Sequence, residues 1–440
     1  MLKKNPYVQT YTTKSGALLI IDSYHNGLYK VQPEKKDTFL RALNDLDGNA
    51  ELIDLLLDKK ILYKEEETHI PDYDELFEEF LTVKGEELTL ILLPTEGCNF
   101  RCMYCYESHD NKVMTKELQD SIIEFVRKNI EKYQAVRLNW FGGEPLCQVG
   151  IVDYLSQQIR AICKEVKKPF LASMTTNGYL LDLDTCKRMI RKNKVIDYQI
   201  TLDGLAATHD KQRPLANQGE TFDTILSNLK AIRDNIKSQF LRITIRCNVT
   251  KQVMENFGDY LEMLYNEFGS DDRFAFCWKI AWEPEEKTDE NYCEEHSLGE
   301  LLNMAHDKRL RLDFLRSSFS LFGNICYASF PGCFTIGSDG TVYKCTVAFD
   351  ADINQIGMLK ENGIMELDEK KCHYWDGKIE ANNLQKCKEC VNAPTCLGIV
   401  CRRSCKNSEN NIVCSDLFSH NEIMLELLSK NEQYVESIGV

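Results

Sequence analysis

The sequence predicts an α/β protein whose centre is a partial (β/α)6 barrel, preceded by a winged-helix-like α+β domain and followed by a loop-rich domain dense in cysteine. Three observations predict this fold class. Six short apolar runs alternate with stretches of helical periodicity from Leu88 onward, the first 85 residues follow another pattern, and turns and cysteines replace the helical periodicity after about Tyr327. We therefore expect domains at residues 1–85, 86–315 and 316–440.

The first 85 residues predict a small α+β domain. Strand-like runs flank a pair of helical stretches, which is typical of a winged-helix-like fold. In chain order the expected segments are the strands Val8–Thr12, Ala17–Ile21 and Leu28–Val31, the helices Pro33–Leu43 and Ala50–Leu57, and a β-like run at Ile61–Tyr63. The acidic stretch Glu65–Glu79, which contains Pro71, is expected to be the linker to the next domain.

Strands alternating with helices predict a parallel sheet with right-handed crossovers for the central domain. The expected strands are Leu88–Pro94, Val136–Phe141, Phe170–Thr175, Ile196–Leu202, Leu241–Val249 and Phe274–Trp282. The expected helices include Lys116–Lys128, Val152–Val166, Asp184–Lys192, Phe222–Ile236 and Met254–Phe268, and a last helix is expected at His420–Ser437. Active sites on parallel sheets lie beyond the carboxyl ends of the strands, so the residues that follow each strand matter most.

Charge and hydropathy exclude several classes of partner. The net charge is −15, from 68 acidic and 53 basic residues, which argues against nucleic acid and against an anionic membrane. No apolar run approaches the ~20 residues that span a bilayer. Residues Met1–Thr13 do not resemble a signal peptide. We expect a cytoplasmic protein.

Nineteen cysteines are the unusual feature of the composition. The cytosol keeps thiols reduced, so clustered cysteines there indicate metal binding more often than disulfides. Three of them lie at Cys98–Cys105 and nine, not counting Cys372, between Cys326 and Cys414. The scattered ones are expected to be small buried apolar residues, namely Cys147, Cys163, Cys186, Cys247, Cys277, Cys293 and Cys372.

The first cluster has the spacing C-x3-C-x2-C and comes directly after a predicted strand, with its thiols at Cys98, Cys102 and Cys105. A short loop can bend three thiolates towards one cubane cluster, and three ligands for four irons leave one iron open. A structural zinc site would need a fourth ligand, and only His109 lies close by, without further support. The pattern favours a catalytic [4Fe–4S] cluster.

With Tyr104 before its last cysteine, this loop resembles the signature of radical S-adenosylmethionine (SAM) enzymes. In that family the open iron is chelated by the methionine moiety of SAM, and reduction of the cluster cleaves SAM to a 5′-deoxyadenosyl radical. The resemblance implies SAM, one radical SAM [4Fe–4S] cluster held by the three cysteines, and an external one-electron reductant such as flavodoxin or ferredoxin.

Motifs after the next three strands support the resemblance. Gly142, Gly143 and Glu144 are similar to the family's GGE motif, which holds the SAM ammonium, although alone they would indicate only a turn. The remaining SAM contacts that the resemblance implies are Asn177 in Thr-Asn-Gly, Thr201 in Thr-Leu-Asp-Gly, Arg213 for the SAM carboxylate, and Tyr104 near the adenine.

The cysteine-dense end resembles the SPASM extension of radical SAM enzymes, which implies two auxiliary [4Fe–4S] clusters. By that resemblance the first cluster uses Cys326, Cys333, Cys345 and one cysteine downstream, and the second uses Cys387, Cys390, Cys396 and Cys414. The downstream ligand is either Cys401 or Cys405, and we favour Cys401. The clusters either brace a loop-rich domain or carry electrons and hold a substrate thiolate.

A winged-helix-like domain ahead of such an enzyme resembles the RiPP recognition element, which binds a leader peptide as an added strand. The alternative, a DNA-binding head, fits poorly, because residues 1–85 carry 11 basic and 16 acidic side chains. We expect a maturase that installs a thioether or C–C cross-link in a ribosomal precursor peptide. The rivals are an anaerobic sulfatase-maturating enzyme, whose basic aspartate is replaced here by Thr346, and an iron–sulfur redox sensor.

Overall fold

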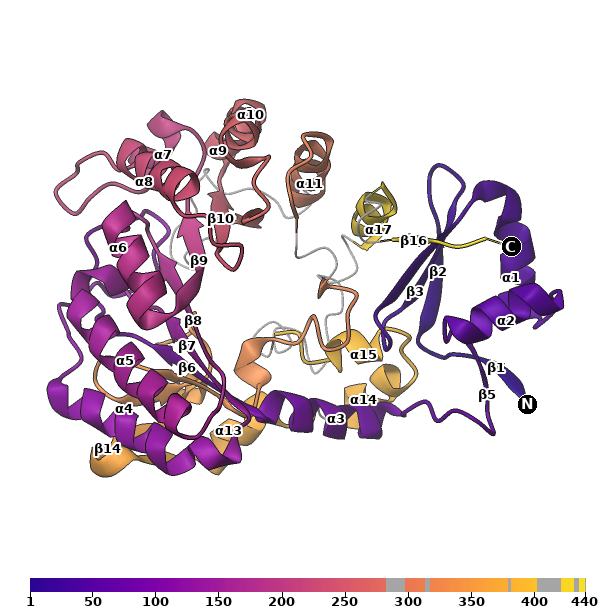
Figure 1. Cartoon of the computed structure of the whole chain (residues 1–440), viewed down its shortest axis with the longest axis horizontal. Helices are drawn as coiled ribbons and strands as arrows, with labels where there is room; N and C mark the ends of the chain where they lie inside the picture. Colours follow the sequence, from indigo (N-terminus) through magenta and orange to yellow (C-terminus); the bar gives the residue numbers. More distant parts are fainter. Residues whose placement is uncertain (282–296, 313–316, 379–380, 402–420, 431–434, 440) are drawn as a thin grey trace. The chain divides into compact units, whose positions relative to one another are not determined.

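The computed structural model describes residues 1–281, 297–312, 317–378, 381–401, 421–430 and 435–439 (Figure 1). The chain forms two compact units. The first comprises Met1–Thr82, Asp313–Cys326 and Lys378–Val440, and the second comprises Val83–Leu312 and Tyr327–Gly377. The division into three domains at residues 85 and 315 stays a prediction.

The second unit is built on a single ten-stranded sheet with the order β11-β10-β9-β8-β7-β6-β12-β13-β14-β15. Neighbouring strands from β6 to β11 follow one another in sequence and are parallel. These six strands are β6 (Glu87–Leu92), β7 (Ala135–Trp140), β8 (Phe170–Thr176), β9 (Val195–Thr201), β10 (Arg242–Val249) and β11 (Phe274–Ile280). The predicted α/β class with a partial six-stranded barrel is confirmed.

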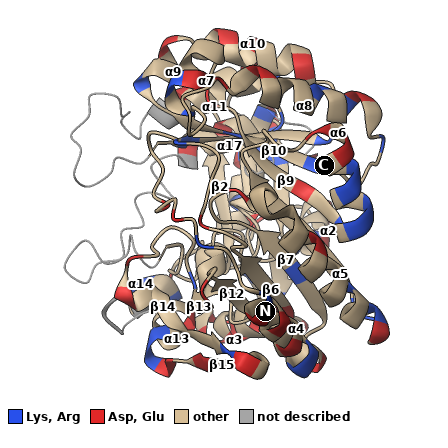
Figure 2. Ribbon diagram, turned by 90° about the vertical axis from the view of Figure 1, so that its left-hand side faces the viewer, with Lys and Arg blue, Asp and Glu red and all other residues tan. Residues whose placement is uncertain are grey.

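Helices connect these strands and cover the sheet. They are α4 (Lys116–Asn129), α5 (Val149–Glu165), α6 (Leu183–Arg188), α7 (Ala206–Gln212), α8 (Phe222–Asn235), α9 (Lys251–Glu255), α10 (Phe257–Phe268) and α11 (Ser297–Asp307). Figure 2 shows Lys, Arg, Asp and Glu along these helices, while the strands carry few of them. The single helix predicted over Met254–Phe268 is in fact two helices, because Asn256 departs from helical geometry with φ −123° and ψ 25°.

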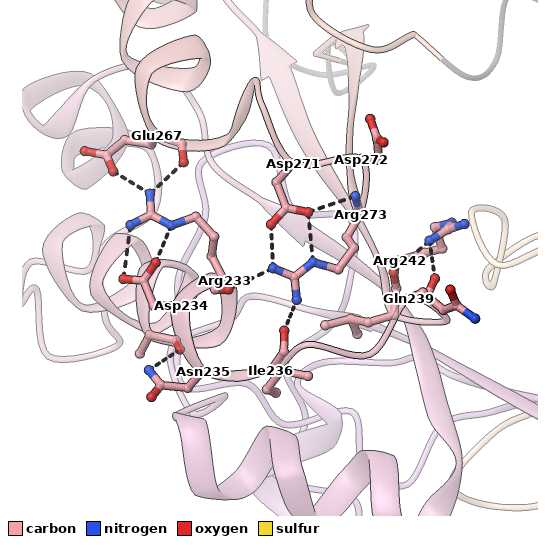
Figure 3. Close-up of polar contacts among 12 residues, drawn as sticks. Arg233, Asp234, Asn235, Ile236, Gln239, Arg242, Glu267, Asp271, Asp272 and Arg273 are labelled. Carbon is pink, nitrogen blue, oxygen red and sulfur yellow. Dashed lines mark hydrogen bonds and ion pairs between the residues drawn. The ribbon is translucent and has the colours of Figure 1, made fainter.

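Polar contacts fix the helices at the amino ends of the last two strands (Figure 3). Arg233 at the end of α8 donates to Asp234 at 2.8 Å and to the Glu267 carboxylate at 3.0 Å. Arg273, just before β11, donates to Asp271 at 2.8 Å and to the Arg233 carbonyl at 2.8 Å. These contacts at the amino ends of the strands serve stability, since the chemistry of such a barrel belongs to the opposite ends of the strands.

The cysteine-rich segment extends the barrel sheet, which the sequence did not predict. Strand β12 (Cys333–Ile336) pairs in parallel with β6, and β13 (Thr341–Tyr343), β14 (Gln355–Lys360) and β15 (Ile364–Leu367) follow antiparallel. The predicted turn at Asp339–Gly340 joins β12 to β13, and Gly340 has φ +90°, a conformation that favours glycine. The 3₁₀ turn Tyr327–Ser329 precedes β12, and α13 (Glu369–Asp376) follows β15.

The first unit contains an antiparallel sheet of β2 (Val8–Thr12), β3 (Leu18–Asp22) and β4 (Gly27–Val31). A second pair joins β1 (Leu2–Lys4) to β5 (Leu62–Lys64). The helices are α1 (Lys36–Asn44), α2 (Ala50–Asp58), α3 (Tyr73–Gly85, whose last residues belong to the second unit), α14 (Ala381–Lys388), α15 (Ala393–Cys396) and α17 (Asn421–Lys430). Side chains of the sheet and of α1 and α2 share one core, which includes Leu18, Ile20, Val31, Phe39 and Leu56.

Two expectations for this unit were wrong. The acidic segment Glu65–Glu79 is not all linker, because α3 begins at Tyr73; its apolar residues Leu76, Phe77 and Phe80 lie at helical spacing and are buried. The last helix, predicted over His420–Ser437, does not reach Ser437: α17 is described over Asn421–Lys430, and Glu436–Ser437 form a short strand, β16, that pairs in parallel with β4. None of the helices in the described part of the chain is both long and apolar enough to cross a bilayer.

Candidate active site at the carboxyl ends of the barrel strands

The registers of the parallel strands bring the predicted motifs to one edge of the sheet. Leu92 of β6 lies beside Trp140 of β7, and Thr176 of β8 lies beside Ile200 of β9. Each of these strands therefore ends at nearly the same level, and the loops that follow them meet. These loops carry the cysteines, the Gly-Gly-Glu turn, Asn177 and the Thr-Leu-Asp-Gly turn.

The cysteine loop holds three half-buried thiols, Cys98, Cys102 and Cys105. The Phe100 amide donates to the Cys98 sulfur at 3.3 Å. Burial raises the pKa of Cys98 to about 12 and that of Cys105 to about 11, and the neighbouring thiol of Cys102 adds to both rises. The thiolate forms therefore need a bound positive charge, which an iron cluster supplies.

The segment that follows α7 holds this loop in place. The Arg101 amide donates to the Pro214 carbonyl and the Met103 amide to the Gln212 carbonyl, both at 2.9 Å. Phe100 forms an isolated bridge with Leu215. Residues 212–215 thus hold the cysteine loop in position through main-chain contacts.

The Gly-Gly-Glu turn packs directly against the start of the cysteine loop. The Gly143 amide donates to the Thr95 carbonyl at 3.2 Å, and the Glu144 amide donates to the Gly97 carbonyl at 3.0 Å. A Cβ on Gly143 would lie 2.3 Å from the Gly97 carbonyl oxygen. Gly142 has φ +103°, a backbone conformation that residues with a side chain rarely adopt, so this position also favours glycine. The turn requires both glycines because the two loops are in van der Waals contact.

Glu144 joins the loops after β7 and β8. Its carboxylate is fully buried and accepts from the Asn177 amide at 2.7 Å, from the Thr176 hydroxyl at 2.8 Å and from the Leu146 amide at 3.0 Å. Burial raises the pKa of Glu144, and these hydrogen bonds oppose the rise. The Asn177 side chain donates in turn to Asn99 of the cysteine loop at 2.8 Å.

Arg213 is a buried cation beside the cysteine loop. Its side chain is 5% exposed, and its guanidinium lies 5.7 Å from the centre of the Phe100 ring. One of its terminal nitrogens lies 3.9 Å from the Asp203 carboxylate and donates to the Tyr104 hydroxyl at 3.5 Å. Its Nε is buried and has no hydrogen-bond partner among the described residues. A buried donor without a partner suits an anionic ligand group such as a carboxylate.

Tyr104 and Asp203 complete this cluster. The Tyr104 hydroxyl donates to Asp203 and accepts from the Asn248 side-chain amide at 2.9 Å. The other Asp203 oxygen accepts from the Asn248 main-chain amide at 2.7 Å. Thr201 is buried at the end of β9, in register with Arg246 of β10. The structure thus gathers every predicted SAM-contact residue at the carboxyl edge of the sheet, while their contacts with SAM stay a prediction.

Comparison with known proteins decides the nature of this site. Residues 92–262 match the model of the Radical SAM superfamily. The chain carries a radical SAM domain. The matched span includes the cysteine loop and every strand-end motif described above, so this site belongs to the radical SAM domain.

Individual relatives match this chain over different lengths. A cysteine-type anaerobic sulfatase-maturating enzyme of Clostridium novyi (strain NT) is 27% identical over 79% of this chain and 99% of its own length. A GTP 3′,8-cyclase of Clostridium perfringens is 33% identical, over 35% of this chain and 46% of its own.

Two solved structures share the fold. Native anSMEcpe with bound AdoMet and the Cp18Cys peptide has a TM-score of 0.59 and 20% identity, and the match covers 78% of this chain and 97% of that one. Streptococcus suis SuiB bound to precursor peptide SuiA has a TM-score of 0.50 and 15% identity, covering 94% of this chain and 98% of that one.

Sequence reasoning missed two contributors to the radical SAM site, Asp203 and Asn248. Asp203 lies within the quoted Thr-Leu-Asp-Gly turn, yet it was assigned no role. Asn248 stands at the carboxyl end of β10, and a polar residue there is the signal that could have found it. Their importance comes from contacts with Tyr104 and Arg213, which a linear pattern does not show.

The predicted auxiliary-cluster cysteines are divided between the units. Cys333 begins β12 and Cys345 follows β13 in the second unit, whereas Cys326, Cys387, Cys390, Cys396 and Cys401 belong to the first. Amides donate to the sulfurs of Cys345 and Cys396 at 3.4 and 3.5 Å, as one does to Cys98. Cys405 and Cys414 lie outside the described residues. Both ligand sets stay predictions.

In the described part of the chain, no three histidine, cysteine or carboxylate side chains converge on a single-ion site. Such a site is not what a cubane needs, because each thiolate binds a different iron. The three thiols, which interact electrostatically within one loop, the amide donor to Cys98 and the adjacent buried cation fit an iron–sulfur cluster with an anionic ligand beside it.

The scattered cysteines follow the prediction only in part. Cys163, Cys186 and Cys247 are buried, as expected for small apolar residues. Cys147 is exposed, which the prediction had wrong, because it lies in the 3₁₀ turn after the Gly-Gly-Glu motif. Cys277 and Cys372 are half-buried, and Cys293 lies outside the described residues.

Replacing Gly143 with alanine tests the contact between the two loops. The new methyl group would meet the Gly97 carbonyl oxygen at 2.3 Å, so the cysteine loop has to move. We expect SAM cleavage to 5′-deoxyadenosine to fall at least about tenfold, or ~1.4 kcal/mol. Gly150→Ala in α5 is the matched control, because nothing lies within 4 Å of the added Cβ. Equal losses in both variants would contradict the packing argument.

Asp203→Asn tests the buried ion pair. It leaves the Arg213 charge without its carboxylate, which for buried pairs costs about 3–5 kcal/mol of unfolding free energy. Urea unfolding followed by tryptophan fluorescence measures the loss, because all four tryptophans belong to the second unit. The control is Asp184→Asn, whose partner Lys187 lies 3.9 Å away and whose side chain is 97% exposed; we expect a change below about 1 kcal/mol. An equally small change for Asp203→Asn would refute the pair's structural role.

Proposed function

We propose that this radical SAM enzyme is a peptide maturase that installs a thioether or C–C cross-link in a ribosomally made precursor peptide. The observation that carries the proposal is the additional sheet-and-helix module formed by residues from Val8 to Lys64. A small sheet of this kind can take up an extended peptide at its edge. The radical SAM domain needs no such module for the chemistry itself.

The comparisons support the same proposal. The Clostridium novyi sulfatase-maturating enzyme matches 79% of this chain and the anSMEcpe structure matches 78%, although both are matched over nearly their whole length. The SuiB structure, which contains a bound precursor peptide, is matched over 94% of this chain. The match to the structure with a bound precursor peptide thus extends over more of this chain than the other two matches do.

Each residue of the site has a proposed part. Cys98, Cys102 and Cys105 hold the radical SAM cluster, and Arg213 binds the SAM carboxylate through its unpartnered nitrogen. Tyr104 lies against the adenine, while Gly142, Gly143 and Glu144 place the ammonium, with Asn177 and Thr201 completing the contacts. When bound, cluster and SAM supply a radical that takes one hydrogen atom from the peptide. For a thioether, the peptide thiol would lose a proton, and an auxiliary cluster held by the C-terminal cysteines would supply the acceptor for the remaining electron.

Two auxiliary [4Fe–4S] clusters complete the proposal. Cys326, Cys333, Cys345 and Cys401 would hold the first, and Cys387, Cys390, Cys396 and Cys414 the second. An external flavodoxin or ferredoxin would reduce the radical SAM cluster. The precursor peptide would be recognised by the N-terminal module, and we propose that the enzyme acts in the cytoplasm.

A second candidate is an anaerobic sulfatase-maturating activity, which is favoured by the match over 99% of the Clostridium novyi relative. The resemblance to that family requires an aspartate base after an auxiliary-cluster cysteine. Thr346 stands there instead, is 7% exposed, and shares a 2.6 Å hydrogen bond with Tyr327. A threonine hydroxyl does not ionise near neutral pH, so this residue cannot be the base.

Replacing the three loop cysteines together with alanine tests the cluster assignment. We expect 5′-deoxyadenosine formation to be abolished and the iron content to fall by one cluster, while the other clusters remain. Cys163→Ala is the control, because that buried thiol on α5 lies outside the loop and should leave both readouts unchanged. Cleavage that survives the triple replacement would overturn the assignment.

Mass spectrometry of a co-expressed precursor peptide distinguishes the two candidate functions. A cross-link removes two hydrogens from the peptide, whereas sulfatase maturation converts a cysteine or serine side chain to an aldehyde. A cross-link that maps between two residues of one peptide is the expected result. An aldehyde would favour the second candidate.

A further inference from the structure

The sheet of the first unit has an unusual edge strand. Strands β2, β3 and β4 have five residues each and pair antiparallel. On the outer side of β4 lies β16, which has only two residues, Glu436 and Ser437, and comes from the far end of the sequence (Figure 1). Glu436 lies beside Tyr29, and Ser437 beside Lys30.

The main chain of β16 contributes little to its attachment. Its pairing with β4 is parallel, which is less stable per residue than the antiparallel pairing of the rest of the sheet. The Ile438 amide donates to the Lys30 carbonyl at 2.9 Å. Both residues of β16 expose their side chains. A strand this short is held mainly by what flanks it.

The residues on either side of β16 supply apolar anchors. Ile438 is 7% exposed and packs in the core with Leu18, Val31 and Phe39. Val435 is 8% exposed. Burying an isoleucine side chain is worth roughly 1.5–3 kcal/mol. The pocket beside β4 is therefore one that recognises an aliphatic side chain on an extended segment.

Charge adds a second element of recognition. The Glu436 carboxylate lies 3.0 Å from the Lys59 ammonium, and this hydrogen bond raises the pKa of Lys59. Lys35 approaches the tail at Gly439, where its ammonium would lie 3.8 Å from an added Cβ. Although residues 1–85 are acidic overall, lysines lie along this edge. The edge thus fits an acidic residue followed two positions later by an aliphatic one.

We propose that the β4 edge is a peptide-binding site which the chain's own residues 435–439 occupy in the absence of substrate. A peptide with the pattern acidic–x–aliphatic would add to β4 in place of β16 and fill the Ile438 pocket. The inference rests on the proposed function, because it names the feature by which the module would select its precursor. A peptide that binds the intact protein has to displace a tethered competitor. The apparent affinity is therefore the affinity of the open edge multiplied by the fraction of molecules in which the edge is open.

Fluorescence anisotropy with a labelled peptide of residues 433–440 tests the site directly. The proteins are the full chain with its clusters and a variant that ends after residue 434. We expect the shortened variant to bind the peptide at least about tenfold more tightly, because its edge is open. A peptide with aspartate in place of the isoleucine should not bind. Equal affinities for both proteins, or no binding by a folded shortened variant, would overturn the proposal.

A point variant covers the case in which the shortened chain fails to fold. Glu436→Lys places a cation beside Lys59 without removing a core side chain, since Glu436 is 55% exposed. We expect this variant to bind the labelled peptide more tightly than the wild type does. The control is Ser437→Ala, which also changes an exposed residue of β16 and should leave the affinity unchanged. No gain over Ser437→Ala would contradict the proposal.

The binding measurement also separates this inference from the proposed function. Anisotropy requires neither SAM nor a reduced cluster, so it does not depend on the cross-linking chemistry. Binding without any product from a co-expressed precursor would refute the maturase activity and leave the edge site standing. Product formation together with equal peptide affinities of the full and shortened chains would refute the edge site and leave the maturase activity standing.

Discussion

The close approach of two loops at the carboxyl edge of the barrel is the contact on which the rest of the site depends. Gly143 and Gly97 touch through main-chain atoms, and amides of the Gly-Gly-Glu turn donate to carbonyls just ahead of Cys98. The position of the first thiol is thereby fixed by hydrogen bonds to a neighbouring strand end. A three-thiol loop this short contains too few contacts of its own to be rigid.

A second constraint is electrostatic. Arg213 and Asp203 are both buried, and each would be costly alone. Tyr104 and Asn248 complete the hydrogen bonds of the carboxylate, so the guanidinium keeps one nitrogen without a partner in the described chain. This arrangement keeps a positive charge beside the thiols before any ligand binds, and preorganised charge is an effective way to bind an anion.

Much of the fold and of the site could be predicted from the sequence. Alternating apolar runs located all six barrel strands to within about two residues, and the register of parallel strands then made the strand-end motifs neighbours. The errors have physical causes. The acidic residues at the start of helix α3 indicate a linker. Its buried face, however, shows helical spacing, at Tyr73, Leu76, Phe77 and Phe80. Strands β12 and β16 pair with partners far away in sequence, and no local pattern indicates such pairing. Asp203 and Asn248 matter through contacts across strands, which spacing alone does not reveal.

The pairing of β12 with β6 has a consequence for electron flow. Cys333 lies on β12, and β6 leads directly into the loop of Cys98, so both belong to one continuous hydrogen-bonded sheet. Adjacent strands keep a spacing of ~4.8 Å and resist stretching. The sheet would therefore help to set the distance between redox centres attached at these two places. At a set distance, the rate of electron transfer between them would depend on driving force and reorganisation energy.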